Sequence, residues 1–129
     1  MPIVVDASAF VELLLQTSRA AAVVKAVGGT DMVAPDLLNV EVLSVLRKLE
    51  QNGTLTAARA IQAVSDLSQT PLQRLPTLPL LSGVWTLRPN VSPYDACYVV
   101  AARILGCSLV TADVRLTRAP HLGVTVVVV

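Results

Sequence analysis

Four acidic residues stand where a parallel α/β fold would gather their side chains. Asp6 ends the apolar run IVVD, and Asp113 ends the run SLVTAD. Glu41 and Asp95 lie near the starts of two predicted helices. Because the carboxyl ends of parallel strands meet at one edge of a sheet, we expect the four carboxylates to converge on one crevice.

Such a cluster requires protons or cations, because like charges repel. At an effective dielectric constant of about 20, two carboxylates ~5 Å apart repel by roughly 3 kcal/mol. His121 is the only histidine, and Cys97 and Cys107 lack metal-ligand spacing, so zinc is not expected and the thiols are interpreted as small buried groups. Oxygen ligands without histidine or cysteine favour Mg²⁺ or Mn²⁺.

Each acid also has a purely structural explanation. Asp95 is the third helical residue in SPYD, where Ser92 would cap the helix and a carboxylate suits the free amides and the dipole. Asp6 and Asp113 could each cap the helix that follows, and Glu41 could be a solvated residue at the border of an apolar stripe. The convergence of all four is what favours a functional site.

Two hydroxyl residues accompany the acids at the predicted strand ends. Ser8 follows Asp6 by two residues, and Thr111 precedes Asp113 by two. Their hydroxyls could orient a carboxylate, as supporting residues around a metal do, or could serve as local caps. Ser8 is also a candidate N-cap for the first helix.

The elements that must position these residues follow the alternation typical of βαβ units. Apolar runs predict strands, listed here by range: 3–6, 31–35, 71–76, 108–113 and 124–129. Helical periodicity and caps predict helices, again by range: 8–16, 18–27, 37–53, 56–69 and 92–106, with 78–90 ambiguous. The expected fold is a three-layer α/β sandwich with a central parallel sheet of four or five strands and helices on both faces.

Length and composition limit the remaining possibilities. The chain has 129 residues, which suits a single domain spanning 1–129, and 53% of them are hydrophobic while only 3% are aromatic. No apolar run reaches the ~18 residues of a membrane span, and no basic segment with an apolar core opens the chain, so we expect a cytoplasmic protein. The net charge of +1 requires any polyanion to be held by a local cluster.

The ordered blocks resemble the PIN-domain ribonucleases, and in particular the VapC-type toxins of bacterial toxin-antitoxin pairs. IVVDAS resembles the opening strand and first acid of that family, and APDLLNVEVLSVLRK its second-acid helix. SPYDACYVVAARILGCSLVTAD resembles the third acid, its helix and the fourth-acid strand. The resemblance covers essentially the whole chain and implies a PIN-like fold.

The resemblance implies a metal-dependent endoribonuclease. In it, Asp6, Glu41, Asp95 and Asp113 would be the catalytic residues that hold Mg²⁺ or Mn²⁺, with Ser8 and Thr111 in support. The cation would activate water and stabilise charge on the phosphate and the leaving 3′ oxygen.

The resemblance also implies the partners and the substrate. The substrate would be single-stranded or looped RNA, such as a structured tRNA or rRNA. A small antitoxin would occupy the active-site groove, and the toxin would form a homodimer.

One position departs from the family pattern. Ser44 stands three residues after Glu41, where many members have asparagine, and Asn39 lies on another face of the helix. Ser44 could keep a shorter hydrogen bond in place of the asparagine.

Three basic residues are candidates for binding RNA. Arg115 and Arg118 follow Asp113 closely, and Lys48 lies on the Glu41 helix. Solvated surface charge is the alternative interpretation for all three.

Two other classes of protein compete with the nuclease hypothesis. A PIN-like module that has lost catalysis could bind RNA or protein, although all four acids are present. A phosphatase of the haloacid-dehalogenase type would have a second aspartate in place of Ser8, and a receiver domain would have an acid pair after the first strand. The sequence shows neither pattern.

Overall fold

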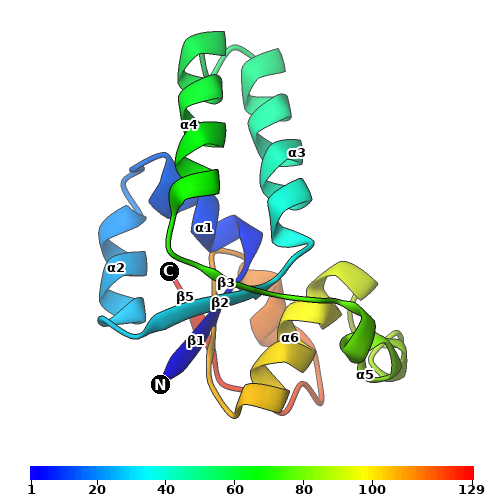
Figure 1. Ribbon diagram of the computed structural model, residues 1–129. Coiled ribbons are helices and arrows are strands. Elements are labelled where there is room, and N and C mark those ends of the chain that lie inside the picture. The colour runs from blue at the N-terminus through cyan, green and yellow to red at the C-terminus, as the bar shows by residue number, and fades with distance from the viewer.

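A parallel five-stranded sheet with strand order β3-β2-β1-β4-β5 forms the centre of the protein. The computed structural model describes residues 1–129 (Figure 1). The strands, in chain order, are β1 (Pro2–Val5), β2 (Asp31–Pro35), β3 (Gln73–Leu75), β4 (Leu109–Thr111) and β5 (Val126–Val128). This confirms the prediction of a parallel sheet, including the short strand at β3.

Six α-helices and two 3₁₀ helices connect the strands. The α-helices are α1 (Ala7–Leu14), α2 (Ala20–Val27), α3 (Leu38–Gln51), α4 (Ala57–Gln69), α5 (Leu81–Thr86) and α6 (Pro93–Leu105). The 3₁₀ helices are η1 (Leu78–Leu80) and η2 (Val114–Arg118). None of the helices has the length and apolar content needed to cross a membrane.

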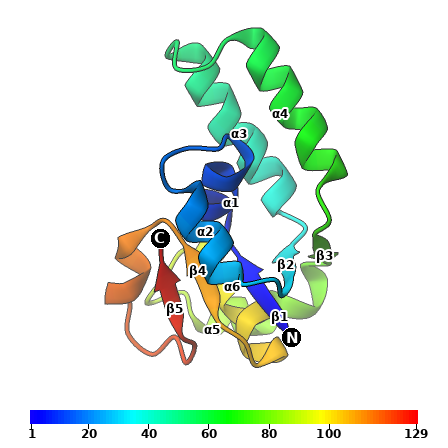
Figure 2. The same cartoon turned by 90° about the vertical axis from the view of Figure 1, so that its left-hand side faces the viewer.

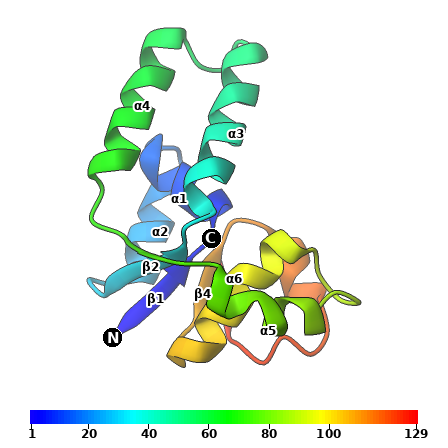
Figure 3. The same ribbon diagram turned by 45° about the vertical axis from the view of Figure 1, so that its right-hand side comes forward.

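The helices cover both faces of the sheet, as predicted. The sheet separates α1 and α2 on one side from α5 and α6 on the other (Figures 2 and 3). The helices α3 and α4 form an antiparallel hairpin that projects beyond the sheet, with α1 packed against its base (Figure 1). The chain runs from β1 through β2 to β3 and then returns past β1 to β4 and β5. Because crossovers between parallel strands are generally right-handed, these two directions place the connecting helices on opposite faces.

The reversal of direction occurs at β1, which pairs with β2 on one side and β4 on the other. Val5 of β1 is in register with Val110 of β4, and the Asp6 amide donates to the Val110 carbonyl at 3.0 Å. Asp6 therefore lies beside Thr111, just beyond the paired residues. Ligands of open α/β sheets bind at such a switch point.

The core consists of aliphatic side chains from β1, β4 and the inner helix faces. Val4, Val5, Leu109 and Val110 are fully buried, and helix α6 buries seven consecutive residues from Ala96 to Ala102. Three of those seven are alanines, whose small side chains allow α6 to lie close to the sheet. The position of Asp95 at the start of α6 follows from this close packing.

Several expected helix ends are confirmed, and one is wrong. Thr56 and Ser92 cap α4 and α6, and Gly28 ends α2 in the left-handed conformation with a φ of 59°. Ser8 is not the cap of the first helix. Asp6 holds that position, because its carboxylate accepts from the Ala9 amide and leaves the Ser8 hydroxyl free for other contacts.

The segment 78–90 contains two short helices. A 3₁₀ turn, η1, leads directly into α5, which ends at Thr86, before Pro89. Pro79 lies within the first turn of η1, where its missing amide proton leaves no donor unsatisfied.

Candidate active site

Four carboxylates from separate elements line one open cavity of about 500 Å³. Asp6 follows β1 and Asp113 follows β4, while Glu41 and Asp95 lie in the first turns of α3 and α6. The structure thus brings together the four acids that the sequence analysis singled out. The cavity lies at the carboxyl ends of the central strands.

Asp6 is buried, with only 5% of its surface exposed, and its carboxylate accepts three hydrogen bonds. Its Oδ1 accepts from the Ser8 hydroxyl at 2.7 Å and from the Ala9 amide at 3.0 Å. Its Oδ2 accepts from the Thr111 hydroxyl. These donors hold the Asp6 carboxylate in one orientation.

The direction of the two hydroxyl protons follows from their other partners. The Ser8 hydroxyl oxygen accepts from the Ala112 amide, and the Thr111 hydroxyl oxygen accepts from the Asp113 amide, both at 2.9 Å. Each oxygen therefore already has a donor, and its own proton is available for Asp6. Ser8 and Thr111 thereby link the end of β4 to the acid at the end of β1.

Glu41 is held by a residue that the sequence analysis missed. The hydroxyl of Tyr98, whose exposure is 2%, donates to Glu41 Oε1 at 2.6 Å. Burial and the contact with Glu41 raise the pKa of Tyr98, so it remains a protonated donor. Tyr98 comes three residues after Asp95 on the same helix, a spacing that places both on one face and could have identified it.

Burial and mutual repulsion disfavour the charged forms of three acids. Burial raises the pKa of Asp6, and the charge of Asp95 adds to this. Burial, followed by the charges of Asp95 and Asp6, raises the pKa of Glu41. The pKa of Asp95 is raised by burial and by the charge of Asp113. The four acids therefore share one electrostatic environment.

Asp113 differs, because Arg115 neutralises it. The Arg115 Nη2 donates to Asp113 Oδ2 at 2.7 Å, and its Nε donates to Oδ1 at 3.0 Å. This pairing lowers the pKa of Asp113 below its ordinary value. With the side chains in these positions, no three His, Cys, Asp or Glu residues form a group that could hold a metal ion.

The remaining candidate residues lie at different distances from the acids. Ser44 lines the same cavity as Glu41, whereas Asn39 accepts from Arg74 at 2.7 Å and does not line it. Arg118 lines an adjoining cavity that Asp95 and Arg115 share. Lys48 lies in the last turn of α3, outside both cavities.

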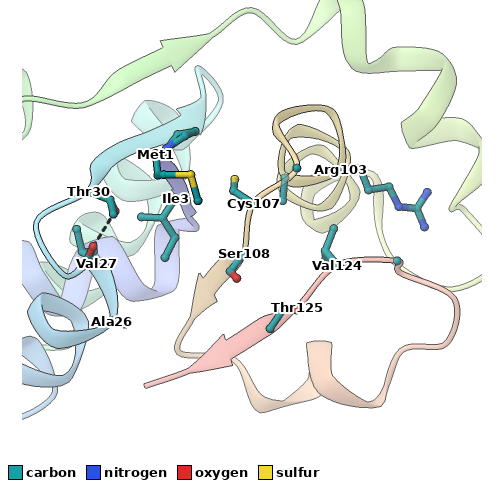
Figure 4. A pocket seen from close by; sticks show the side chains of 14 residues that line it. Met1, Ile3, Ala26, Val27, Thr30, Arg103, Cys107, Ser108, Val124 and Thr125 are labelled. Atoms are coloured by element: carbon teal, nitrogen blue, oxygen red, sulfur yellow. Dashed lines mark hydrogen bonds between the residues drawn. The ribbon is translucent and has the colours of Figure 1, made fainter.

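A second cavity, of about 510 Å³, lies at the amino ends of β1, β4 and β5 (Figure 4). Its lining contains no acid, and its one charged side chain, Arg103, donates to the backbone carbonyls of His121 and Leu122. Burial raises the pKa of the Cys107 thiol there, which favours the unreactive form. The acid-lined cavity is therefore the candidate active site.

Comparison with known proteins identifies the family to which these features belong. A model of the PIN domain family matches residues 3–122. Ribonuclease VapC3 of Mycobacterium tuberculosis is 42% identical over 118 residues, covering 91% of this chain and 86% of the relative. VapC ribonuclease Mb0985 of Mycobacterium bovis is 39% identical over 115 residues, covering 89% of this chain and 88% of the relative.

Solved structures share the fold at lower sequence identity. VapBC2 from Rickettsia felis, solved bound to a DNA fragment from its promoter, superposes with a TM-score of 0.69 at 12% identity, covering 98% of this chain and 97% of that chain. The Mycobacterium tuberculosis toxin VapC20, described as cleaving the sarcin-ricin loop, superposes with a TM-score of 0.65 at 16% identity. The match covers 90% of this chain and 93% of that chain.

Replacing Thr111 with valine should destabilise the protein most at neutral pH. The change removes a donor to the buried Asp6 carboxylate at nearly constant volume, which costs about 1–3 kcal/mol while Asp6 is ionised. Thermal melts in EDTA at several pH values measure the effect, and the deficit should shrink when acid protonates Asp6. The control Thr111→Ser keeps the hydroxyl, so its smaller deficit should not depend on pH. Equal pH profiles for the two variants would contradict the proposed role of the hydroxyl.

The cation-free protein should melt at a higher temperature at pH 5 than at pH 7. A carboxyl group whose pKa is raised on folding binds more protons folded than unfolded, so stability falls as pH rises above its ordinary value. Asp6, Glu41 and Asp95 each lower the stability of the folded state as the pH rises above their ordinary pKa values. Those values are 3.8, 4.5 and 3.8. Asp113 acts oppositely, but only below 3.8.

The variant Asp95→Asn serves as the comparison for the pH series. It should melt higher than the parent at pH 7 in EDTA, because it removes repulsion of roughly 1–3 kcal/mol against a smaller capping loss. Its melting temperature should also depend less on pH. A parent melting temperature that is constant or falls on acidification would contradict the electrostatic description.

Proposed function

The chain belongs to the PIN domain family, and from this premise we propose that it is a Mg²⁺- or Mn²⁺-dependent endoribonuclease, the toxin of a toxin-antitoxin pair. The observation that carries the proposal is the convergence of Asp6, Glu41, Asp95 and Asp113 on one cavity from four separate elements. The ribonuclease names of relatives at 39% and 42% identity support the same reaction. Residues 1–129 would form one PIN-like domain.

The donor set fits a hard divalent cation. The acid-lined cavity offers carboxylate and hydroxyl oxygens but no histidine or cysteine. A carboxylate has about four lone-pair sites, and the three hydrogen bonds to Asp6 leave one for a cation. Asp6, Glu41, Asp95 and Asp113 would hold the ion, and positive charge there would favour the ionised forms that burial opposes. When bound, the cation supplies activation of water and stabilisation of charge on the phosphate and the leaving oxygen.

The surrounding residues would position this machinery. Ser8 and Thr111 fix the Asp6 carboxylate, and Tyr98 fixes that of Glu41. Such preorganisation matters because a catalytic group displaced by about 1 Å can lose 10²-fold in rate.

The substrate we propose is RNA held by its phosphates. Arg118 lies in the cavity that adjoins the acids, which places a positive charge where a neighbouring phosphate would pass. Lys48 could contact the substrate only further along α3. Ser44 could donate a hydrogen bond to RNA from the cavity wall.

We also propose partners on the surface of the α3–α4 hairpin. Val40 and Leu43 of α3 and Ile61 and Val64 of α4 are exposed apolar residues. Apolar surface of this kind suits a protein contact. The family likeness leads us to propose an antitoxin that occupies the active-site groove, which Val40 also lines, and a second copy of the chain that packs on the hairpin in a homodimer. Such a toxin would act on cellular RNA in the cytoplasm.

RNA cleavage should require a divalent cation and the Asp6 carboxylate. We expect cleavage with Mg²⁺ or Mn²⁺, none in excess EDTA, and a rate at least ~10²-fold lower for Asp6→Asn, equivalent to about 2.7 kcal/mol. Gel assays of a labelled RNA measure the rates. The control Asp31→Asn removes an exposed carboxylate at the start of β2 and should cleave as the parent does.

Two results would contradict this assignment. Undiminished cleavage in EDTA would exclude cation dependence, and parental activity in Asp6→Asn would reduce Asp6 to a helix cap. Absence of any cleavage with either cation would favour the alternative of a PIN-like module without catalysis, which the ion pair between Asp113 and Arg115 also suits.

Production of the parent chain alone in bacterial cells should arrest growth, because RNA cleavage would proceed without the antitoxin. Asp6→Asn should allow growth at the same protein level, and Asp31→Asn should arrest growth like the parent. Growth curves with immunoblots for protein level provide the measurement. Equal arrest by the parent and Asp6→Asn would separate toxicity from catalysis.

A further inference from the structure

The ion pair between Asp113 and Arg115 occupies both oxygens of one of the four acids. Oδ1 accepts from the Arg115 backbone amide at 2.9 Å and from Nε at 3.0 Å. Oδ2 accepts from Nε at 3.1 Å and from Nη2 at 2.7 Å. A cation that used Asp113 would have to compete with this guanidinium for the same oxygens.

The guanidinium is free to leave. The Arg115 side chain is 81% exposed, whereas that of Asp113 is 22% exposed. Asp113 is its only ion-pair partner, so moving it breaks no other ion pair, and the charge of Asp95 acts on it without a direct contact. By contrast, the donors to Asp6 belong to buried or partly buried residues whose displacement would disturb β4 and α1.

Arg115 also lies where a displaced guanidinium would meet a substrate. It lines both the acid-lined cavity and the adjoining cavity that contains Arg118. A guanidinium presents a planar fork of donors that binds a phosphate as well as it binds a carboxylate. The two cavities together therefore offer Arg115 a second position on an RNA phosphate.

We propose that Arg115 is a displaceable counter-ion that neutralises Asp113 in the cation-free protein and moves to a substrate phosphate when a divalent cation binds. The inference rests on the proposed function, since it assumes that cation and RNA share this site. Under this proposal the cation and the RNA favour each other's binding. The cation releases Arg115 from Asp113 for the RNA phosphate, and the RNA phosphate draws Arg115 away from the Asp113 oxygens that the cation needs.

The first test is the Mn²⁺ dissociation constant, measured by calorimetry without RNA. Arg115→Ala should bind Mn²⁺ about 5-fold more tightly than the parent, the upper range for loss of one exposed ion pair. Arg118→Ala removes the same charge from the same 3₁₀ helix without freeing an acid, and its Kd should stay within about 2-fold. An unchanged or weaker Mn²⁺ affinity in Arg115→Ala would overturn the inference.

A double-mutant cycle shows whether the effect acts through Asp113. In the Asp113→Asn background, adding Arg115→Ala should leave the Mn²⁺ Kd within about 2-fold, because there is no charged partner to release. The same 5-fold gain in that background would show a general charge effect and overturn the inference.

The second test follows RNA. Fluorescence anisotropy measures the Kd for a short single-stranded RNA in EDTA. The Kd values of the parent and of Arg115→Ala should agree within about 2-fold, because in the parent Asp113 holds the guanidinium away from the RNA. At saturating Mn²⁺, Arg115→Ala should raise KM for that RNA about 10-fold, the loss of one charge-assisted phosphate contact. Weaker RNA binding by Arg115→Ala in EDTA would show that Arg115 already reaches RNA, and would overturn the inference.

The tests separate failure of this inference from failure of the proposed function. If neither the parent nor any variant binds Mn²⁺, the cation site and the inference both fail. If all bind Mn²⁺ with equal affinity and cleave RNA, the nuclease stands and the counter-ion role of Arg115 fails.

Discussion

The burial of the Asp6 carboxylate is the constraint on which the rest of the site depends. A buried charge without partners costs several kcal/mol, so its donors must be in place when the chain folds. The register of β1 against β4 brings Thr111 to one oxygen, and the first turn of α1 brings Ser8 and the Ala9 amide to the other. Sheet pairing, helix capping and the site are therefore parts of one hydrogen-bond network.

The four acids are compensated in different ways, and the difference matters for chemistry. Asp6 is held by neutral donors, and Glu41 by a phenol. Asp113 alone has a full positive charge beside it. Neutral donors orient a carboxylate without cancelling its charge, so the ionised forms of Asp6 and Glu41 keep their full negative charge, whereas the charge of Asp113 is balanced by Arg115.

Much of this arrangement could be predicted from the sequence, because it follows from strand ends and helix starts. The convergence of Asp6 and Asp113 requires only that their strands be parallel neighbours, and the caps at Thr56 and Ser92 follow from local chemistry. The sequence is compatible with Asp6 as a helix cap and with Asp6 as a residue of the site. The structure places Asp6 at the cap and in the cavity together, because the N-terminus of α1 points into the cavity.

Sequence spacing indicates the helix face on which a residue lies, but it does not predict which atoms the side chain contacts. Tyr98 lies in an apolar helix, where a buried aromatic residue usually only fills the core, and only its hydroxyl reaches Glu41. The Arg115 contact depends on a 3₁₀ turn that turns the side chain back to Asp113, whereas sequence spacing showed only that Arg115 follows the acid. The segment 78–90 was ambiguous because Pro79 and Pro89 limit any helix there to a few residues.

The projection of the α3–α4 hairpin has a mechanical consequence for the site. Helix α3 contains 14 residues, and at a rise of about 1.5 Å per residue its tip stands roughly 21 Å from its base. A tilt of about 5° about the base would move the tip by nearly 2 Å, yet Glu41, in the first turn, would move by only a few tenths of an ångström. Tyr98 holds Glu41 from the opposite layer, so the hairpin would pivot close to this acid of the candidate active site. A displacement of its far end would therefore change the position of the Glu41 carboxylate very little.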